Sequence, residues 1–144
     1  MCLVNATATG TELLKNLVLP GMGSFTIVDA EPVSARDLGN NFFVTKRHLG
    51  QPRARCACEL LTEMNPDVKG DWLAEGVDAL LAKNPTFFNS FTVVVATGLP
   101  EASLLPLAAI LWAAKVPLLV ARSYGMVGTL RLVTEEHSGE ERKQ

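Results

Sequence analysis

The sequence predicts a doubly wound α/β fold, in which a mostly parallel sheet carries helices on both faces. Stretches with the apolar pattern of a strand alternate with stretches patterned as helices along almost the whole chain. Residues 91–97, Phe-Thr-Val-Val-Val-Ala-Thr, suit a central parallel strand that is covered on both faces. The chain has 144 residues, of which 48% are hydrophobic and 19% charged, and this composition suits one globular domain with a sizeable core.

The first unit of the chain is predicted to be a strand, a helix and a second strand. Residues 3–4 are apolar, and after Gly10 the apolar side chains recur on one helix face, at Leu13, Leu14, Leu17 and Val18. The Pro-Gly-Met-Gly stretch 20–23 ends this helix. The β-branched run 25–28 that follows ends at Asp29, as a second parallel strand does. A right-handed crossover joins the two strands.

The middle of the chain holds a long connection and a second long helix. Residues 31–50 form a connection whose length indicates that it binds something or packs as a local turn of helix. The second helix is predicted from Pro52 to about Asn65, because proline suits a first turn and Pro66 follows. Its apolar positions are Ala57, Leu60, Leu61 and Met64. A strand over residues 68–73 and a short helix over 78–83 come next.

The last part of the chain is predicted to hold a helix over residues 102–114, a buried strand over 116–121, a turn at Tyr124 and Gly125, and a final strand over 127–133. The apolar stretch 104–121 contains two prolines and Lys115, so we interpret it as a buried helix and a buried strand rather than as a membrane span. The domain is expected to span residues 1–135, and the polar residues 136–144 form a tail.

Composition excludes several classes of function. A net charge of −2 provides no basic field for nucleic acid or for anionic lipid. The three cysteines, Cys2, Cys56 and Cys58, are too few for a disulfide framework and are expected to be free, packed thiols. His48 and His137 are far apart in sequence, so no metal site is expected. The amino-terminal residues do not resemble a secretory signal, which favours an intracellular protein.

The turn between the first strand and the first helix is where a nucleotide-binding fold of this kind holds phosphate. That turn normally reads G-x-G-x-x-G, in which the second glycine lets the backbone approach phosphate and the third lets the helix pack closely. Here it reads Asn-Ala-Thr-Ala-Thr-Gly, so only Gly10 remains, with Asn5 and Thr7 at the other two glycine positions. The hydroxyls of Thr7 and Thr9 can cap the helix or hold an anion weakly. The turn favours a fold without its nucleotide.

Asp29 ends the second strand and has two interpretations. An acidic residue at this place accepts hydrogen bonds from a ribose in dinucleotide-binding folds. An aspartate at a strand end also commonly bonds its own backbone in a turn. The sequence leaves both open.

Four stretches carry a resemblance to a known family: residues 2–21, with Asn-Ala-Thr-Ala-Thr-Gly before Thr-Glu-Leu-Leu-Lys-Asn, then Gly-Asn-Asn-Phe-Phe at 39–43, residues 91–97, and Arg-Ser-Tyr-Gly-Met-Val-Gly at 122–128. In this order, over nearly the whole chain, they resemble the regulatory subunits of the heterodimeric activating enzyme of the neddylation pathway, in the ThiF-like superfamily of ubiquitin-like modifier activating enzymes. The resemblance implies a Rossmann-like adenylation fold in the half of the heterodimer that does no chemistry.

The resemblance also implies that the residues around ATP are replaced. Catalytic members of the superfamily carry an Asn-x-x-Arg-Gln run, whose positions here appear as Asp37, Asn40 and Asn41, so that Asn40 replaces an arginine that neutralises phosphate. The phosphate-contacting lysine that opens the next helix appears as Arg53, whereas Asp29 matches the ribose-binding acid.

The magnesium-linked aspartate of the family falls near Leu99 and is absent unless Glu101 substitutes for it through a shifted register. The resemblance therefore implies a degenerate nucleotide site with no cofactor, no metal and no catalytic residue on this chain, at Asn5, Thr7, Thr9, Gly10, Asp29, Asn40 and Arg53. ATP and magnesium are expected on the partner subunit. No nucleophilic cysteine is recognisable, because two thiols fall on the covering helix and one in the first strand.

The function that the resemblance implies is that of a pseudoenzyme, the non-catalytic regulatory subunit that scaffolds a catalytic partner. The partner adenylates the ubiquitin-like modifier and forms the thioester, in the cytoplasm and the nucleus. The family has a segment before this chain and further domains after it, so a fragment or an isoform is expected. Phe42, Phe43, Met126 and Val127 are candidates for the partner's apolar surface, and each also suits the core. A Rossmann-type nucleotide-binding oxidoreductase and an inert truncated isoform are the alternatives.

Overall fold

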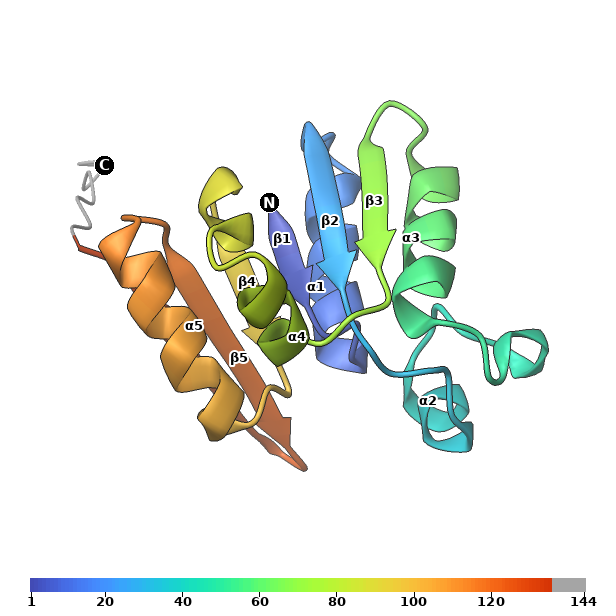
Figure 1. Ribbon diagram of the computed structural model, residues 1–144. Coiled ribbons are helices and arrows are strands. Elements are labelled where there is room, and N and C mark those ends of the chain that lie inside the picture. Colours follow the sequence, from blue (N-terminus) through green and yellow to red (C-terminus); the bar gives the residue numbers. More distant parts are fainter. Residues whose placement is uncertain (136–144) are drawn as a thin grey trace, which may run out of the picture.

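The computed structural model describes residues 1–135, and the predicted polar tail, residues 136–144, lies outside them. Within the described residues the chain forms a sheet of six strands with helices on both faces (Figure 1). The strands are β1 (Cys2–Val4), β2 (Ser24–Val28), β3 (Lys69–Leu73), β4 (Val94–Thr97), β5 (Leu118–Tyr124) and β6 (Val127–Val133). The helices are α1 (Ala8–Val18), α2 (Ala35–Asn40), α3 (Arg53–Met64), α4 (Val77–Lys83) and α5 (Glu101–Ala113), with 3₁₀ turns η1 (Lys46–His48) and η2 (Phe87–Ser90).

The strand order is β3-β2-β1-β4-β5-β6. All neighbouring strands pair in parallel except β5 and β6, which form an antiparallel hairpin. The order runs outward from β1 in one direction through β2 and in the other through β4, as in a doubly wound sheet. The predicted fold class is confirmed, and so is the central place of the strand that ends at Thr97.

The core has two layers because successive side chains of each strand point to opposite faces. Leu3 of β1 packs with Leu14 of α1 and Leu61 of α3 on one face. Val4, its neighbour in β1, packs with Leu107 and other side chains on the face that α4 and α5 cover. Figure 1 shows α4 and α5 in front of the sheet and α1 behind it.

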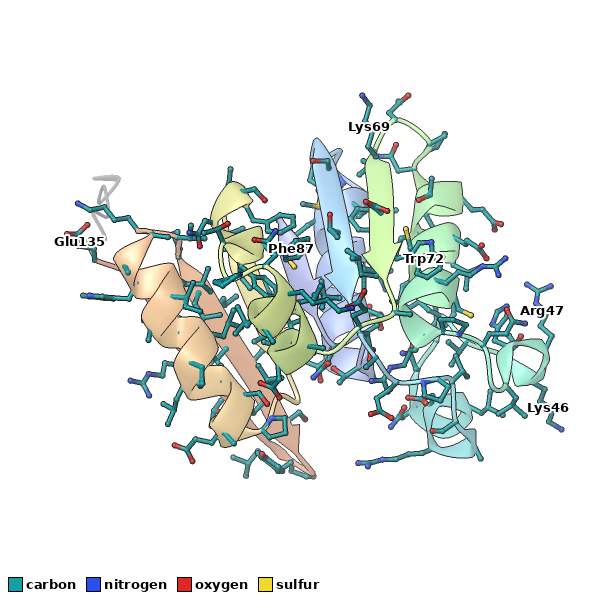
Figure 2. All side chains as sticks on the ribbon, viewed as in Figure 1. Lys46, Arg47, Lys69, Trp72, Phe87 and Glu135 are labelled. Carbon is teal, nitrogen blue, oxygen red and sulfur yellow. The ribbon has the colours of Figure 1, made fainter. Side chains whose placement is uncertain are left out.

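The predicted element bounds hold closely for the helices and less well for two strands. Helix α3 begins after Pro52 and ends before Asn65, as predicted. The long connection 31–50 contains α2 and η1, so it does pack as local helical turns, and η1 projects Lys46 and Arg47 away from the sheet (Figure 2). The strand predicted over residues 91–97 begins only at Val94, because the chain bends at residues 91 and 92 as it leaves η2. The strand predicted over 116–121 is β5, which continues further because β6 pairs with it along its length.

The prediction that the helix within residues 104–121 is buried is wrong for its outer face. Leu105 and Trp112 of α5 are 61% and 53% exposed, since α5 packs on the sheet through one face only. Leu17 and Met64 were expected on the inner faces of α1 and α3, and both are partly exposed near the ends of their helices. In the part of the chain that the structure describes, no helix has the length and apolar character needed to cross a membrane.

Gly10 lets α1 approach the strand ends. A Cβ atom at this position would lie 2.7 Å from the hydroxyl oxygen of Thr97 and 2.8 Å from the carbonyl oxygen of Asn5. Real Cβ atoms do not approach oxygen so closely, and the carbonyl belongs to a backbone that other contacts hold. The structure therefore assigns the surviving glycine of the turn to close helix packing.

Gly10→Ala is expected to lower the free energy of unfolding by about 1–3 kcal/mol, because the added methyl group overpacks the junction of α1, β1 and β4. Urea denaturation followed by circular dichroism measures this change. Gly39→Ala in α2 is the control, since a Cβ there meets nothing within 4 Å and should be neutral or stabilising. Equal stability of the two variants would show that the junction is not tightly packed.

Candidate functional site

Two adjoining hollows open near the carboxyl ends of β1 and β4, where a doubly wound sheet binds its ligands. Their volumes are about 340 and 320 Å³. Both are lined by Thr7, Ala8, Arg36 and Asn40, the first also by Asp37 and Arg53, and the second also by Thr9, Thr97 and Ser123. Among the predicted site residues, Asn5, Gly10 and Asp29 are not part of either lining.

The turn before α1 is closed by its own side chains. Asn5 has a φ of 65°, a left-handed conformation that asparagine tolerates better than most residues, so it replaces the turn glycine. The Thr7 hydroxyl oxygen accepts the Gly10 N–H at 3.2 Å and caps α1. Thr97 donates its hydroxyl proton to the Asn5 carbonyl at 2.7 Å, so Thr7 donates to Thr97 at 2.8 Å. The Thr7 hydroxyl, which the sequence suggested could hold an anion at the start of α1, is therefore used to cap that helix.

Asp29 is 1% exposed, and both of its carboxylate oxygens accept hydrogen bonds. Oδ1 accepts the Glu31 N–H at 2.9 Å, which is the turn interaction expected of an aspartate at a strand end. Oδ2 accepts the Ala6 N–H at 2.8 Å and so holds the turn after β1. The geometry favours the turn interpretation of this residue over the ribose-binding one.

Arg53 begins α3 and joins two carboxylates. Its guanidinium contacts both oxygens of Asp29, with Nε 2.7 Å from Oδ2 and Nη2 3.2 Å from Oδ1, while Nη1 lies 3.0 Å from Asp37 Oδ1. The Arg53 side chain is only 12% exposed. Burial opposes its charge, but the hydrogen bonds and charges of Asp29 and Asp37 outweigh burial and raise its pKa. Hereafter Asp29, Arg53 and Asp37 are called the ion network.

Asp37 also lies in the first turn of α2. Its Oδ2 accepts the N–H and the hydroxyl of Ser34 at 2.8 and 2.7 Å. Burial disfavours the charge, but the Ser34 hydrogen bonds and the Arg53 charge prevail and lower the pKa of the Asp37 carboxyl. The ion network connects the end of β2 with α2 and α3.

Asn41 is the residue whose role sequence reasoning missed. Its side-chain oxygen accepts the Phe43 N–H at 3.0 Å and the Thr11 hydroxyl at 3.3 Å, and its Nδ2 donates to the Ala6 carbonyl at 3.2 Å. Asn41 is thus buried between the connection and the turn before α1, whereas Asn40 is exposed in the wall of both hollows. The only signal in the sequence is the place of Asn41 in the run that the resemblance identifies, because its hydrogen bonds join residues far apart in sequence.

The structure places no carboxylate at the position expected for magnesium. Leu99 is buried in the core beneath α5, and Glu101 is exposed at the start of α5, outside the linings of both hollows. Across residues 1–135 no group of three or more histidine, cysteine, aspartate or glutamate side chains is placed to hold a metal ion. His137 lies outside the described residues.

The three thiols are free and buried, as predicted. Burial raises the pKa of Cys2 to about 12 and that of Cys58 to about 11. It also raises the pKa of Cys56. Because the thiolate is the nucleophile, these thiols are poorly suited to thioester formation near neutral pH.

The model of the ThiF family matches residues 1–142. The chain belongs to the ThiF family. It is 56% identical over 95% of its length to the "NEDD8-activating enzyme E1 regulatory subunit" of Gallus gallus, and covers 26% of that protein. It is 46% identical over 99% of its length to the regulatory subunit named AXL of Arabidopsis thaliana, and covers 27% of that one. It is 30% identical over 98% of its length to the "DNA damage tolerance protein RHC31" of Saccharomyces cerevisiae, and covers 40% of it.

These comparisons confirm the resemblance to the neddylation regulatory subunits. The chain spans about a quarter of the length of the regulatory subunits that it matches. In this ThiF-family chain, the region of the two hollows holds the ion network and a helix cap made by the chain itself. We call it the nucleotide region, because the resemblance places a nucleotide site there.

Arg53→Ala is expected to lower the free energy of unfolding by about 3 kcal/mol, because it leaves the buried carboxylates of Asp29 and Asp37 without their cation. Arg55→Ala is the matched control on the same helix, since Arg55 forms an exposed ion pair with Glu59 and its loss should change stability little. Urea denaturation at neutral pH compares the two variants. Similar small losses in both would show that the ion network contributes little to stability.

Proposed function

We propose that this chain is part of a non-catalytic regulatory subunit of a NEDD8-activating enzyme and serves as a scaffold for the catalytic subunit. The observation that carries the proposal is the ion network. Asp29 and Arg53, which match the nucleotide-contacting positions of the family, bond to each other and to Asp37. The similarity to proteins named regulatory subunits supports the same assignment.

The same region supports the proposed absence of chemistry on this chain. A phosphate entering the hollows has to compete with two carboxylates for Arg53, and it meets no magnesium-binding carboxylate at the Leu99 position. ATP and magnesium are therefore assigned to the partner subunit. Asp29, which suggested the alternative of a nucleotide-binding oxidoreductase, is engaged in its turn and does not favour that function.

The proposed docking surface is the β5–β6 hairpin. Six of the seven residues of β6 are exposed. Exposed apolar side chains gather on the hairpin, at Tyr124, Met126, Val127, Leu130 and Leu132. Leu130 and Leu132 share one face of β6, whereas Val127 lies on the other face beside its paired residue Tyr124. Exposed apolar side chains on an edge strand are typical of a protein interface. Met126 and Val127 thus remain partner candidates.

The two phenylalanines proposed for the same role differ. Phe42 is 78% exposed, whereas Phe43 is 1% exposed and packs with the core beneath α1 and α3, so only Phe42 can meet a partner directly. The two rings are in edge-to-face contact at 5.6 Å, which lets Phe43 support the exposed ring. We also propose that this chain and the catalytic subunit are located in the cytoplasm and the nucleus.

A double variant, Met126→Asp with Leu130→Asp, is expected to weaken binding to the catalytic subunit of a NEDD8-activating enzyme by at least about tenfold, because it buries charge in the apolar interface. Sedimentation of the purified chain, alone and mixed with that subunit, measures complex formation. Leu105→Asp on α5 is the control, since Leu105 is similarly exposed on another face. Unchanged binding by the double variant, or no complex with the original chain, would contradict the proposed surface.

The chain alone is expected to form no acyl-adenylate when it is incubated with ATP, magnesium and the ubiquitin-like modifier. The physical reason is that the cation and the carboxylates of the site are bound to one another. Pyrophosphate exchange measures adenylation, and calorimetry with magnesium ATP measures binding. Adenylate formation by the chain without a partner would refute the non-catalytic assignment.

A further inference from the structure

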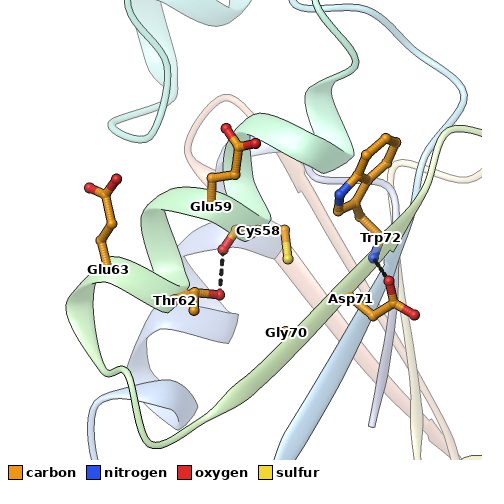
Figure 3. Close-up of a pocket in the computed structure, with 7 residues that line it drawn as sticks. All are labelled: Cys58, Glu59, Thr62, Glu63, Gly70, Asp71 and Trp72. Atoms are coloured by element: carbon orange, nitrogen blue, oxygen red, sulfur yellow. Dashed lines mark hydrogen bonds between the residues drawn. The ribbon is translucent and has the colours of Figure 1, made fainter.

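A third hollow lies apart from the nucleotide region, between α3 and β3, with a volume of about 450 Å³. Glu59 and Glu63 of α3 line one wall, and residues Gly70, Asp71 and Trp72 of β3 line the other (Figure 3). Figure 3 shows the carboxylate of Glu59 and the indole of Trp72 rising on the same side from opposite walls. We call this hollow the acidic groove.

One wall of the acidic groove is an edge strand. β3 pairs with β2 on one side and ends the sheet on the other. The Lys69 N–H donates to Gly23 and the Leu73 carbonyl accepts from Asp29, so these residues direct their backbone groups toward β2. Backbone groups alternate along a strand, and those of Gly70 and Trp72 therefore face the open edge. An open edge can accept one more strand.

The Asp71 side chain of β3 partly blocks this open edge. Asp71 Oδ1 accepts the Trp72 N–H at 2.8 Å, the bond drawn as a dashed line in Figure 3. A Cβ atom at Gly70 would lie 2.7 Å from side-chain atoms of Phe25 and Thr62, so glycine is needed there for the close approach of α3 to β3. An incoming carbonyl can replace Asp71 at the Trp72 N–H, which frees the Asp71 carboxylate to bind a cation.

The negative charge of the acidic groove favours an occupant with positive charge. Its lining residues contribute the carboxylates of Glu59, Glu63 and Asp71 and no basic side chain. Arg55 pairs with Glu59 from the next turn of α3 and offsets one of the three charges. Trp72 is 38% exposed and lies at the outer edge of the sheet in Figure 2. Carboxylates beside an indole suit a lysine or arginine side chain.

We propose that the acidic groove binds a basic, extended segment of a partner protein, which adds to β3 as a further strand. One of its lysine or arginine side chains lies between the Trp72 indole and the carboxylates of Glu59 and Glu63. A second cation meets the carboxylate of Asp71. The proposal is independent of the scaffold function, because the β5–β6 hairpin is at the opposite end of the sheet and presents apolar side chains.

Trp72 itself reports binding. The chain has two tryptophans, so Trp112→Phe leaves Trp72 as the only one. The probe is a short peptide in which pairs of adjacent lysines alternate with threonines, so that an added strand presents a lysine on both of its faces. It is titrated into the full chain at low and at high salt. A saturable change of Trp72 fluorescence that weakens with salt is expected. No saturable change, or equal binding of the matching peptide of glutamate and threonine, overturns the proposal.

Two further measurements separate the parts of the proposal. Glu59→Gln with Glu63→Gln should weaken peptide binding about tenfold, whereas Glu12→Gln with Glu101→Gln, at exposed glutamates of α1 and α5, should not. Amide hydrogen exchange should slow at Gly70 when the peptide binds, because its N–H enters a strand ladder. Equal weakening by both double variants, or binding without protection of Gly70, overturns the proposal.

Discussion

The paired contact of Arg53 with both oxygens of Asp29 is the interaction on which the carboxyl edge of the sheet depends. Asp29 directly follows β2, Arg53 begins α3, and the residues between them would otherwise form a long, unsupported connection. Backbone bonds beside the pair close that connection, with Val33 N–H on the Gln51 carbonyl at 2.8 Å and Arg53 N–H on the Glu31 carbonyl at 3.1 Å. Desolvation of a buried ion pair is offset only when its remaining hydrogen-bonding groups are satisfied, and the backbone bonds to Asp29 meet that condition.

The same network sets the electrostatics of the nucleotide region. A lone arginine at the start of a helix attracts an anion, but Arg53 is already shared between two carboxylates, so the network as a whole carries negative charge. The helix end beside it is capped by Thr7, whose hydroxyl is bonded in turn to Thr97. The region keeps the shape of a ligand site while its polar groups serve to hold the strand ends together.

Much of the fold could be predicted because its signals are local. Pro52 and Pro66 bound α3, and the apolar runs of β2 and β4 reveal strands covered on both faces. The buried face of α5 could not be predicted, since its apolar side chains surround the helix and only packing decides which are exposed.

The site was harder to predict than the fold, because its decisive contacts join distant residues. Thr7 and Thr97 are 90 positions apart, and Asn41 reaches Ala6 across 35. The resemblance assigns Arg53 and Asp29 to the same nucleotide site, but only the structure shows that they form an ion pair with each other. Phe42 and Phe43 are neighbours in a segment without periodicity, so their opposite environments also depended on tertiary packing.

The hairpin of β5 and β6 joins two strands that are unequally protected. β5 is paired on both sides, whereas β6 is paired on one and covered on almost none of its length. Segments with few buried contacts open first in the native state, and an opened segment is the one that a protease cleaves. A protein docked on β6, as the proposed scaffold function requires, would suppress this opening, and the lifetime of the chain would then depend on the supply of that protein.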